Sequence, residues 1–444
     1  MSPPPSLETL RSLNHRYRAF VELTNELESS TGSDQGFHFS AKDNLCAKGF
    51  QTRAGSRILE GYRPPFDATA ITRMRAAGGV LLGKTNMDEF GFGTFSTNSG
   101  YEVPLNPFDV ERACGGSSGG AAAATSLLDG HVALGVSTGG SISCPAAFCG
   151  VLGLTPTYGR VSRYGLVDYA NSLDKIGLLA RSSADLRRCL RIISGPDPKD
   201  PTSCVQTPLR LDGERIVSVA VPEESLENLS PAVKEGFDSA LASLRGMGVD
   251  VRTVTMPALR FALPAYYILA TSEASTNLAR YCGMRFGVRG TNVSQHFNDF
   301  FSEVRSENFG EEAKRRILLG TYARMVGFRD RYYLKALSVR QSIISEYAKA
   351  FEKSDLVLTP TMPFVAPKFF EIERMRPLEV YQADFLTVPP NLAGLPHLSA
   401  PCAYAEEMPI AMQFVAPHWE EGRLLGVADV WTSRFKIKFP EVTA

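Results

Sequence analysis

Two loops rich in glycine and serine lie close together in this chain, and each borders an apolar segment. The first spans residues 115–120 (GGSSGG) and the second spans residues 137–141 (STGGS), both within 114–150. Glycine has no Cβ, so successive backbone N–H groups can point into one concavity. Such a concavity suits a bound phosphate or an oxyanion that develops during a reaction. The two loops therefore predict an anion-stabilising site.

The phosphate-binding patterns do not fit these loops. A Walker motif needs Lys followed by Ser or Thr directly after its last glycine, whereas Ala121 follows Gly120. The dinucleotide pattern GxGxxG after a strand is also absent from the sequence. A pair of flexible linkers is the alternative, but each loop ends an apolar segment and presents a serine. The pattern favours a structured site with a serine nucleophile.

A serine nucleophile needs a base, which is most often histidine. The chain has six histidines, none in a catalytic pattern, and it contains no GxSxG elbow. A buried lysine whose pKa is lowered by desolvation can do the same work through a second hydroxyl. Lys42, in the short run FSAKDN, is a candidate. The alternative for Lys42 is a solvated turn residue.

Taken together, Lys42, Ser117 and Ser141 resemble the Ser–cisSer–Lys triad of the amidase signature family. The resemblance covers residues 17–429. Three further segments resemble a narrower group, the A subunits of tRNA-dependent amidotransferases. These segments are GKTNMDEF at 83–90, KRRILLGTY at 314–322 and NLAGLP at 391–396.

The resemblance implies a glutaminase that supplies ammonia to a partner. Lys42 would accept a proton through Ser117, and Ser141 would attack the side-chain amide of glutamine. The oxyanion would be held by backbone N–H groups in the second loop, namely those of Thr138, Gly139, Gly140 and Ser141. Ser118 would order the first loop and line the substrate site.

A free amino acid must be held at both charged ends, and an arginine suits a carboxylate through its bidentate fork. The resemblance implies that Arg316 binds the glutamine carboxylate and Asp384 its ammonium group, with Tyr267 hydrogen-bonding nearby. Arg315 is the alternative to Arg316 for binding the carboxylate. Without the resemblance, residues 314–316 (Lys-Arg-Arg) are interpreted as a solvated helix face and Asp384 as an ordinary helix cap.

The sequence departs from the family pattern beside the nucleophile. Ser137 and Ser143 stand where the family usually has aspartate and arginine, and Ala121 replaces a frequent serine. Two other functions therefore remain open. One is a free-standing amidase of small amides, and the other is a catalytically silent assembly subunit.

The resemblance also implies partners. The chain has no recognisable ATP site, so ATP and Mg²⁺ are expected on a B subunit with kinase and transamidase activity. The net charge is zero, so a misacylated tRNA is expected to bind mainly through that partner. A small third subunit is a further possible partner. No cofactor or metal is expected in this chain, because its eight cysteines include no CxxC pair.

The order of apolar segments predicts the α/β class, with a large mixed sheet surrounded by helices. Strands are expected at 78–84, 132–136, 216–221, 250–254 and 356–360. Helices are expected at 68–77, 230–247, 263–281, 310–326 and 336–353. Asp88 and Glu89 are interpreted as capping residues at a helix start. With no internal repeat and 194–201 interpreted as a surface loop, residues 1–444 are expected to form one amidase domain.

The amino-terminal region, residues 1–30, is expected to be a shortened helical part of that domain. Helical spacing of apolar residues predicts one or two helices within 7–27, followed by a polar loop at 29–35. The first five residues, MSPPP, lack the features of a signal peptide. A prokaryotic cytoplasmic protein is expected, with the mitochondrial matrix as the alternative.

Overall fold

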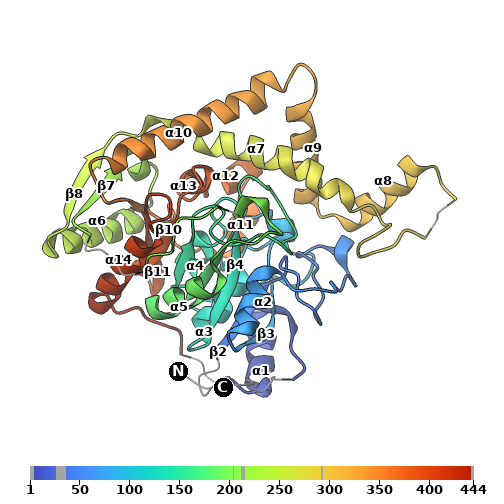
Figure 1. The fold of residues 1–444 in the computed structure, drawn as a ribbon, viewed down its shortest axis with the longest axis horizontal. Coiled ribbons are helices and arrows are strands. Elements are labelled where there is room, and N and C mark those ends of the chain that lie inside the picture. Colours follow the sequence, from blue (N-terminus) through green and yellow to red (C-terminus); the bar gives the residue numbers. More distant parts are fainter. Residues whose placement is uncertain (1–4, 27–36, 204, 212–215, 292–293, 442–444) are drawn as a thin grey trace.

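The computed structural model describes residues 5–26, 37–203, 205–211, 216–291 and 294–441. A sheet of eleven strands runs through the molecule, with helices on both of its faces (Figure 1). The α/β class and the mixed sheet predicted from the sequence are confirmed. The polar loop predicted at 29–35 lies outside the described residues.

The strand order is β1-β3-β2-β4-β6-β5-β10-β11-β9-β7-β8. The strands pair in parallel at β2–β3, β2–β4, β7–β8 and β7–β9 and antiparallel at the other contacts. In chain order the strands are β1 (Phe20–Leu23), β2 (Phe37–Lys42), β3 (Gly79–Thr85), β4 (Val132–Ser137), β5 (Leu152–Thr155), β6 (Lys175–Ala180), β7 (Ser218–Pro222), β8 (Asp250–Val254), β9 (Leu356–Pro360), β10 (His397–Ala405) and β11 (Met408–Val415).

The helices occupy most of the connections between strands. In chain order they are α1 (Leu7–Tyr17), α2 (Thr69–Ala76), α3 (Gly119–Leu127), α4 (Ser143–Phe148), α5 (Ser183–Ile193), α6 (Pro231–Gly246), α7 (Ala262–Asn277), α8 (Phe297–Asn308), α9 (Glu311–Arg324), α10 (Lys335–Phe351), α11 (Phe369–Arg374), α12 (Pro377–Gln382), α13 (Val388–Leu392) and α14 (Glu421–Arg434). No helix within the described segments is both long enough and apolar enough to cross a membrane.

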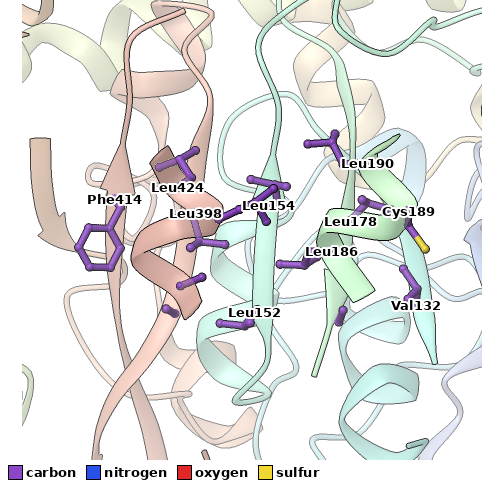
Figure 2. Close-up of a cluster of buried hydrophobic side chains, with 14 of the residues drawn as sticks. Val132, Leu152, Leu154, Leu178, Leu186, Cys189, Leu190, Leu398, Phe414 and Leu424 are labelled. Atoms are coloured by element: carbon purple, nitrogen blue, oxygen red, sulfur yellow. The ribbon is translucent and has the colours of Figure 1, made fainter. Parts of the chain in front are cut away.

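One face of the sheet is covered by α2, α5, α6 and α14. Side chains alternate between the two faces of a strand, so Val132 and Leu134 of β4 point to this face and meet Leu186 and Leu190 of α5. Figure 2 shows this packing across the central strands, with Leu424 of α14 beside Leu398 of β10. The result is a continuous apolar core under this helical layer.

The opposite face carries the residues of chemical interest. α3 and α4 lie against its central strands, while α7, α10 and α13 pack over the part that includes β9. The first residues of α3 are small, and Ala121 to Ala124 are all buried. Their size allows the helix to lie close to the sheet and brings the glycine loop before α3 near the carboxyl ends of β2 and β4.

The predicted helices and strands are confirmed to within a few residues, with one correction. Residues 20–23 form strand β1, whereas the sequence predicted one or two helices within 7–27. Helix α1 ends at Tyr17 because Arg18 adopts a left-handed conformation, with φ of 54°. The chain then turns, and Phe20 pairs with Thr85 of β3. Pairing with the edge of the sheet outweighs the helical spacing.

Candidate active site

Lys42 is the last residue of β2 and lies inside the protein, with 1% of its surface exposed. Its ammonium nitrogen donates to the Ser117 hydroxyl at 2.7 Å and to the Val136 carbonyl oxygen at 3.1 Å. The alternative of a solvated turn is therefore wrong. β2 is parallel to both neighbours β3 and β4, so its carboxyl end delivers Lys42 to the edge where the glycine loops lie.

Burial lowers the pKa of Lys42 from its ordinary value of 10.5 to about 7. The negative charges of Asp88 and Asp174 act in the opposite direction and favour the charged ammonium. Burial also raises the pKa values of these carboxyls, to about 6 for Asp88 and about 7 for Asp174. A lysine with a pKa near 7 is neutral in a large fraction of molecules at neutral pH, so it can accept a proton.

Ser117 and Ser118 lie in the first glycine loop, directly before α3. The Gly116–Ser117 peptide bond is cis. A Cβ on Gly116 would lie 2.2 Å from the Asp88 carboxylate, so only glycine allows that carboxylate so close. Ser118 Oγ donates to the Val136 carbonyl oxygen at 3.3 Å, which is the loop-ordering contact expected for it.

Ser141 lies between β4 and α4 and is 7% exposed, compared with 1% for Ser117. Its hydroxyl has no hydrogen-bond partner among the residues that the structure describes. The Lys42–Ser117 contact is therefore formed, whereas a Ser117–Ser141 hydrogen bond is not. Ser141 is the most exposed of Lys42, Ser117 and Ser141.

The backbone around Ser141 is open for an anion. In the described part of the chain, the N–H groups of residues 138–141 donate to no protein acceptor. Unpaired N–H groups are the donors that an oxyanion needs. The oxyanion role of Thr138, Gly139, Gly140 and Ser141 stays a prediction.

The second loop is held from two sides. Thr138 Oγ1 donates to Asp174 at 2.7 Å, and Asn391 of α13 donates to the Thr138 carbonyl oxygen. A Cβ on Gly140 would lie 2.1 Å from Thr387 Oγ1. The loop is thus fastened through side chains that come from distant parts of the chain.

The two serines that depart from the family pattern differ in their surroundings. Ser137 Oγ donates to the Gly139 carbonyl oxygen at 3.4 Å, so it supports the loop locally. Ser143 is fully buried, and its hydroxyl has no partner within the described residues. Neither serine replaces the ion pair that the family pattern would place there.

Arg316, from the inner side of α9, lies in a ring of aromatic side chains and is 3% exposed. Its guanidinium donates to Glu312 at 2.7 Å and to the Tyr169 hydroxyl at 2.7 Å. The guanidinium carbon lies 5.1 Å from the ring centroids of both Phe92 and Tyr267. These rings and hydrogen bonds hold the guanidinium in one orientation.

Asp384 and Tyr267 belong to the same cluster. The Asp384 carboxylate accepts from Thr94 Oγ1 at 2.9 Å and from the Tyr267 hydroxyl at 3.4 Å. Burial raises the pKa of Asp384 to about 7, and the charge of Arg316 opposes this shift. The neighbouring Tyr266 ring lies against Gly139, where a Cβ would come within 2.8 Å of it. The cluster is therefore adjacent to the second glycine loop.

Arg315 is more exposed than Arg316. Its side chain is 43% exposed and pairs with one oxygen of the buried Glu312 carboxylate, whose other oxygen accepts from Arg316. The geometry favours Arg316 over Arg315 as a carboxylate ligand. The interpretation of this run as a solvated face is correct for Arg315 and wrong for Arg316.

Asp88 and Glu89 do not cap the helix that they begin, which corrects the prediction. Asp88 accepts from the N–H groups of Ser96 and Asn98 and lies close enough to Lys42 to influence its pKa. Glu89 accepts from the N–H of Gly310, the residue before α9. Both carboxylates fix backbone segments that border the site.

Several residues of the site were not predicted from the sequence. Four of them are Asp174, Thr94, Tyr169 and Asn391. Asn391 lies in the NLAGLP segment, to which the sequence assigned no role. The other three carry no local pattern that distinguishes them. No group of three or more His, Cys, Asp or Glu side chains suitable for a metal occurs in the described ranges, and the seven cysteines described are free thiols.

Comparison with known proteins gives a consistent result. The Amidase family pattern matches residues 22–425. The A subunit of the glutamyl-tRNA(Gln) amidotransferase from Picosynechococcus sp. is 43% identical, over 95% of this chain and 92% of the relative. The corresponding A subunit from Methanospirillum hungatei is 44% identical, over 92% of this chain and 95% of the relative.

Solved structures agree. The A subunit of the glutamyl-tRNA(Gln) amidotransferase from Thermotoga maritima superposes with a TM-score of 0.84 at 35% identity, covering 99% of this chain and 93% of that one. The peptide amidase from Stenotrophomonas maltophilia gives a TM-score of 0.81 at 28% identity, covering 98% and 93%.

Proposed function

This chain belongs to the amidase family, and we propose that it hydrolyses glutamine as the A subunit of a glutamyl-tRNA(Gln) amidotransferase. The observation that carries the proposal is the buried 2.7 Å hydrogen bond from Lys42 to Ser117, beside Ser141. The similarity to A subunits over nearly the whole chain supplies the substrate class.

The proposed reaction begins with neutral Lys42, which accepts the proton of Ser117 while Ser117 accepts that of Ser141. The Ser141 oxygen attacks the side-chain carbonyl carbon of glutamine. The N–H groups of residues 138–141 hold the oxyanion. The proton returns through Ser117 to the leaving nitrogen, the C–N bond of the tetrahedral intermediate breaks, and ammonia departs, leaving a glutamyl ester on Ser141.

Water then hydrolyses the glutamyl ester, with the proton transfers running through Ser117 in the reverse order. Lys42 accepts a proton from water through Ser117, and the tetrahedral intermediate collapses to glutamate and free Ser141. Microscopic reversibility requires the same groups in both halves. The products are one glutamate and one ammonia for each glutamine and water consumed.

The substrate is held at its amino-acid end. Arg316 is the ligand of the glutamine carboxylate, because the surrounding aromatic side chains and the Tyr169 hydroxyl orient its guanidinium. Asp384 binds the ammonium group, with the Tyr267 hydroxyl beside it. A cation and an anion in one site select a free α-amino acid over a simple amide. Ser118 lines the site from the first loop.

The ammonia serves a partner. A B subunit would use ATP and Mg²⁺ to activate the misacylated Glu-tRNA(Gln), or Asp-tRNA(Asn), and to transfer the ammonia to it. The tRNA would bind mainly to that partner, and a small third subunit would complete some assemblies. The expected location is the cytoplasm, with the mitochondrial matrix as the alternative.

A second function is favoured by one observation. The fold also superposes on the 6-aminohexanoate cyclic dimer hydrolase, at a TM-score of 0.82 and 26% identity. A free-standing amidase would not need Arg316 and Asp384 to be oriented as they are.

The test is ammonia release from glutamine, by the chain alone and with a B subunit, ATP and misacylated tRNA. Ser141→Ala and Lys42→Ala run in parallel. Release that requires Ser141 and increases with the partner supports the proposal. Hydrolysis of unrelated amides without preference for glutamine would indicate a free-standing amidase, and no Ser141-dependent release in any mixture would indicate a silent assembly subunit.

A further inference from the structure

A short turn at residues 169–174, directly before β6, is closed by the side chain of its own last residue, Asp174. One carboxylate oxygen, Oδ2, accepts from the N–H of Tyr169 at 2.9 Å and from the N–H of Ala170 at 3.0 Å. Asp174 is 1% exposed. Hydrogen bonds from a carboxylate to nearby backbone N–H groups hold such a turn in one conformation.

The other oxygen of Asp174 reaches the second glycine loop. Oδ1 accepts from Thr138 Oγ1 at 2.7 Å. Thr138 is the first of the four residues whose backbone N–H groups are proposed to hold the oxyanion. The same carboxylate is therefore bonded on one side to the loop that carries Ser141 and on the other side to the turn.

The turn leads on to the proposed carboxylate ligand. The Tyr169 hydroxyl accepts from the Arg316 guanidinium at 2.7 Å, and the Tyr169 ring lies edge-on to Phe92 with 4.6 Å between centroids. A tyrosine side chain has only two rotatable bonds, so the place of its hydroxyl follows from its backbone. The contacts of Asp174 with the turn thus help to place the hydroxyl that orients Arg316.

A second side chain joins the same two segments. The Asn391 amide donates to the Thr138 carbonyl oxygen and, at 3.1 Å, to the Leu173 carbonyl oxygen in the turn. Asn391 is 1% exposed. The loop and the turn are therefore tied by two buried polar side chains, of which only Asp174 also bonds the N–H of Tyr169.

Resting on the proposed function, we propose that Asp174 is a positioning residue that sets two subsites at once. It orders the oxyanion loop through Thr138, and it orders the carboxylate ligand Arg316 through Tyr169. Glutamine held at its amino-acid end then presents its side-chain amide at a fixed place relative to Ser141. Such alignment matters, because a displacement of about 1 Å can cost about 10²-fold in rate.

Steady-state glutamine hydrolysis by the Asp174→Ala variant tests the proposal. The variant loses both contacts, so kcat is expected to fall at least about tenfold and KM to rise at least about tenfold. A change in only one parameter would overturn the proposal, because Asp174 would then serve one subsite. If the alanine variant does not fold, Asp174→Ser replaces it, since serine is too short to reach both contacts.

The matched control is Asp197→Ala. Asp197 is 6% exposed, and its carboxylate accepts from the hydroxyls of Thr69 and Ser162, neither of which belongs to the site. Both kcat and KM are expected to stay within about twofold of the unaltered chain. Changes as large as those of Asp174→Ala would assign the effect to a general loss of buried carboxylates and overturn the specific role.

Two single-contact variants separate the subsites. Thr138→Val removes only the loop contact and is expected to lower kcat with little change in KM. Tyr169→Phe removes the hydroxyl beside Arg316 and is expected to raise KM with little change in kcat. In the Asp174→Ala background each substitution is expected to add less than it does alone, because coupled contacts are non-additive. Full additivity of both pairs would overturn the link.

Asp174→Asn distinguishes positioning from an effect of charge or proton transfer. The amide oxygen can accept from the two N–H groups of the turn, and the amide nitrogen can donate to the Thr138 hydroxyl. At about pH 9, above the pKa of Lys42, kcat and KM are expected to stay within about threefold of the unaltered chain. A loss as large as that of Asp174→Ala would overturn the positioning role.

Amide hydrogen exchange gives a result that does not depend on activity. In Asp174→Ala, residues 137–143 and residues 166–174 are both expected to exchange faster than in the unaltered chain, because each segment loses a buried contact. Faster exchange in one segment only would overturn the link. Absence of Ser141-dependent ammonia release from the unaltered chain, alone or with a B subunit, would instead refute the proposed function, and the exchange result would still decide whether Asp174 holds both segments.

Discussion

The ammonium nitrogen of Lys42 lies 2.7 Å from the hydroxyl oxygen of Ser117, although the two residues are 75 positions apart in the chain. Both side chains are 1% exposed. The contact joins the end of a central strand to the glycine loop before α3. In the proposed function this contact supplies a base without a histidine, and burial lowers the pKa of that lysine to about 7.

Replacing Lys42 tests this relationship directly. Lys42→Ala is expected to lower kcat for glutamine hydrolysis by about 10²–10⁴-fold, because a positioned general base contributes that much. Lys42→Arg is expected to fail as well, since guanidinium stays protonated. Ammonia release is the measurement, with Lys48→Ala, an exposed lysine, as the control. Activity retained by Lys42→Arg would contradict the role of a neutral lysine.

The pH dependence follows from the same pKa. Neutral Lys42 is the active form, so kcat/KM is expected to rise with pH through an inflection near 7. The Asp88 charge favours protonated Lys42, so Asp88→Asn is expected to lower the pKa of Lys42 and move the inflection to lower pH. Initial rates between about pH 5 and 9 measure it, a span that brackets this pKa. An inflection that moves upward would contradict the assignment.

Variants of Arg316 and Arg315 test which of the two arginines binds the glutamine carboxylate. Arg316→Lys is expected to raise KM for glutamine by about 10- to 100-fold, the range for losing hydrogen bonds to a charged group. Arg315→Lys is expected to change KM by less than about twofold, because its side chain is 43% exposed and lysine keeps the positive charge beside Glu312. A larger effect of Arg315→Lys on KM would reverse the assignment.

Ser143 offers a prediction about stability. A buried hydroxyl without a partner costs free energy, so Ser143→Ala is expected to stabilise the fold by about 1 kcal/mol. Ser56→Ala serves as the opposite case, because the Ser56 hydroxyl donates to Glu89 at 2.5 Å and its loss is expected to destabilise. Urea unfolding measures both, and destabilisation by Ser143→Ala would show that its hydroxyl is satisfied.

Close packing of α9 on α7 predicts a contrast between two glycines. Gly320→Ala is expected to destabilise the fold by about 1–3 kcal/mol, because a Cβ meets the Thr271 carbonyl oxygen. Gly246→Ala at the end of α6 meets nothing within 4 Å and is expected to stabilise by about 0.4–1 kcal/mol. Thermal unfolding of the two variants checks the contrast, and equal melting temperatures would contradict it.

The amino-acid pattern alone was sufficient to predict most helices and strands. Apolar spacing predicted most helices and strands, since that periodicity is a local property of each segment. The glycine loops suggested a serine nucleophile by their chemistry, whereas Lys42 was joined to Ser117 and Ser141 through the resemblance to the amidase signature family. Periodicity failed at residues 20–23, where pairing of Phe20 with β3 outweighed it.

The charges that surround the reacting groups became visible only in the folded chain. Asp174 contacts Thr138 across 36 residues, and Asp384 contacts Thr94 across 290. The fold also turns Arg316 inward and Arg315 outward. Burial and electrostatic environment arise from segments that the sheet brings together. The pKa of Lys42 therefore depends on these surroundings rather than on its neighbours in the sequence.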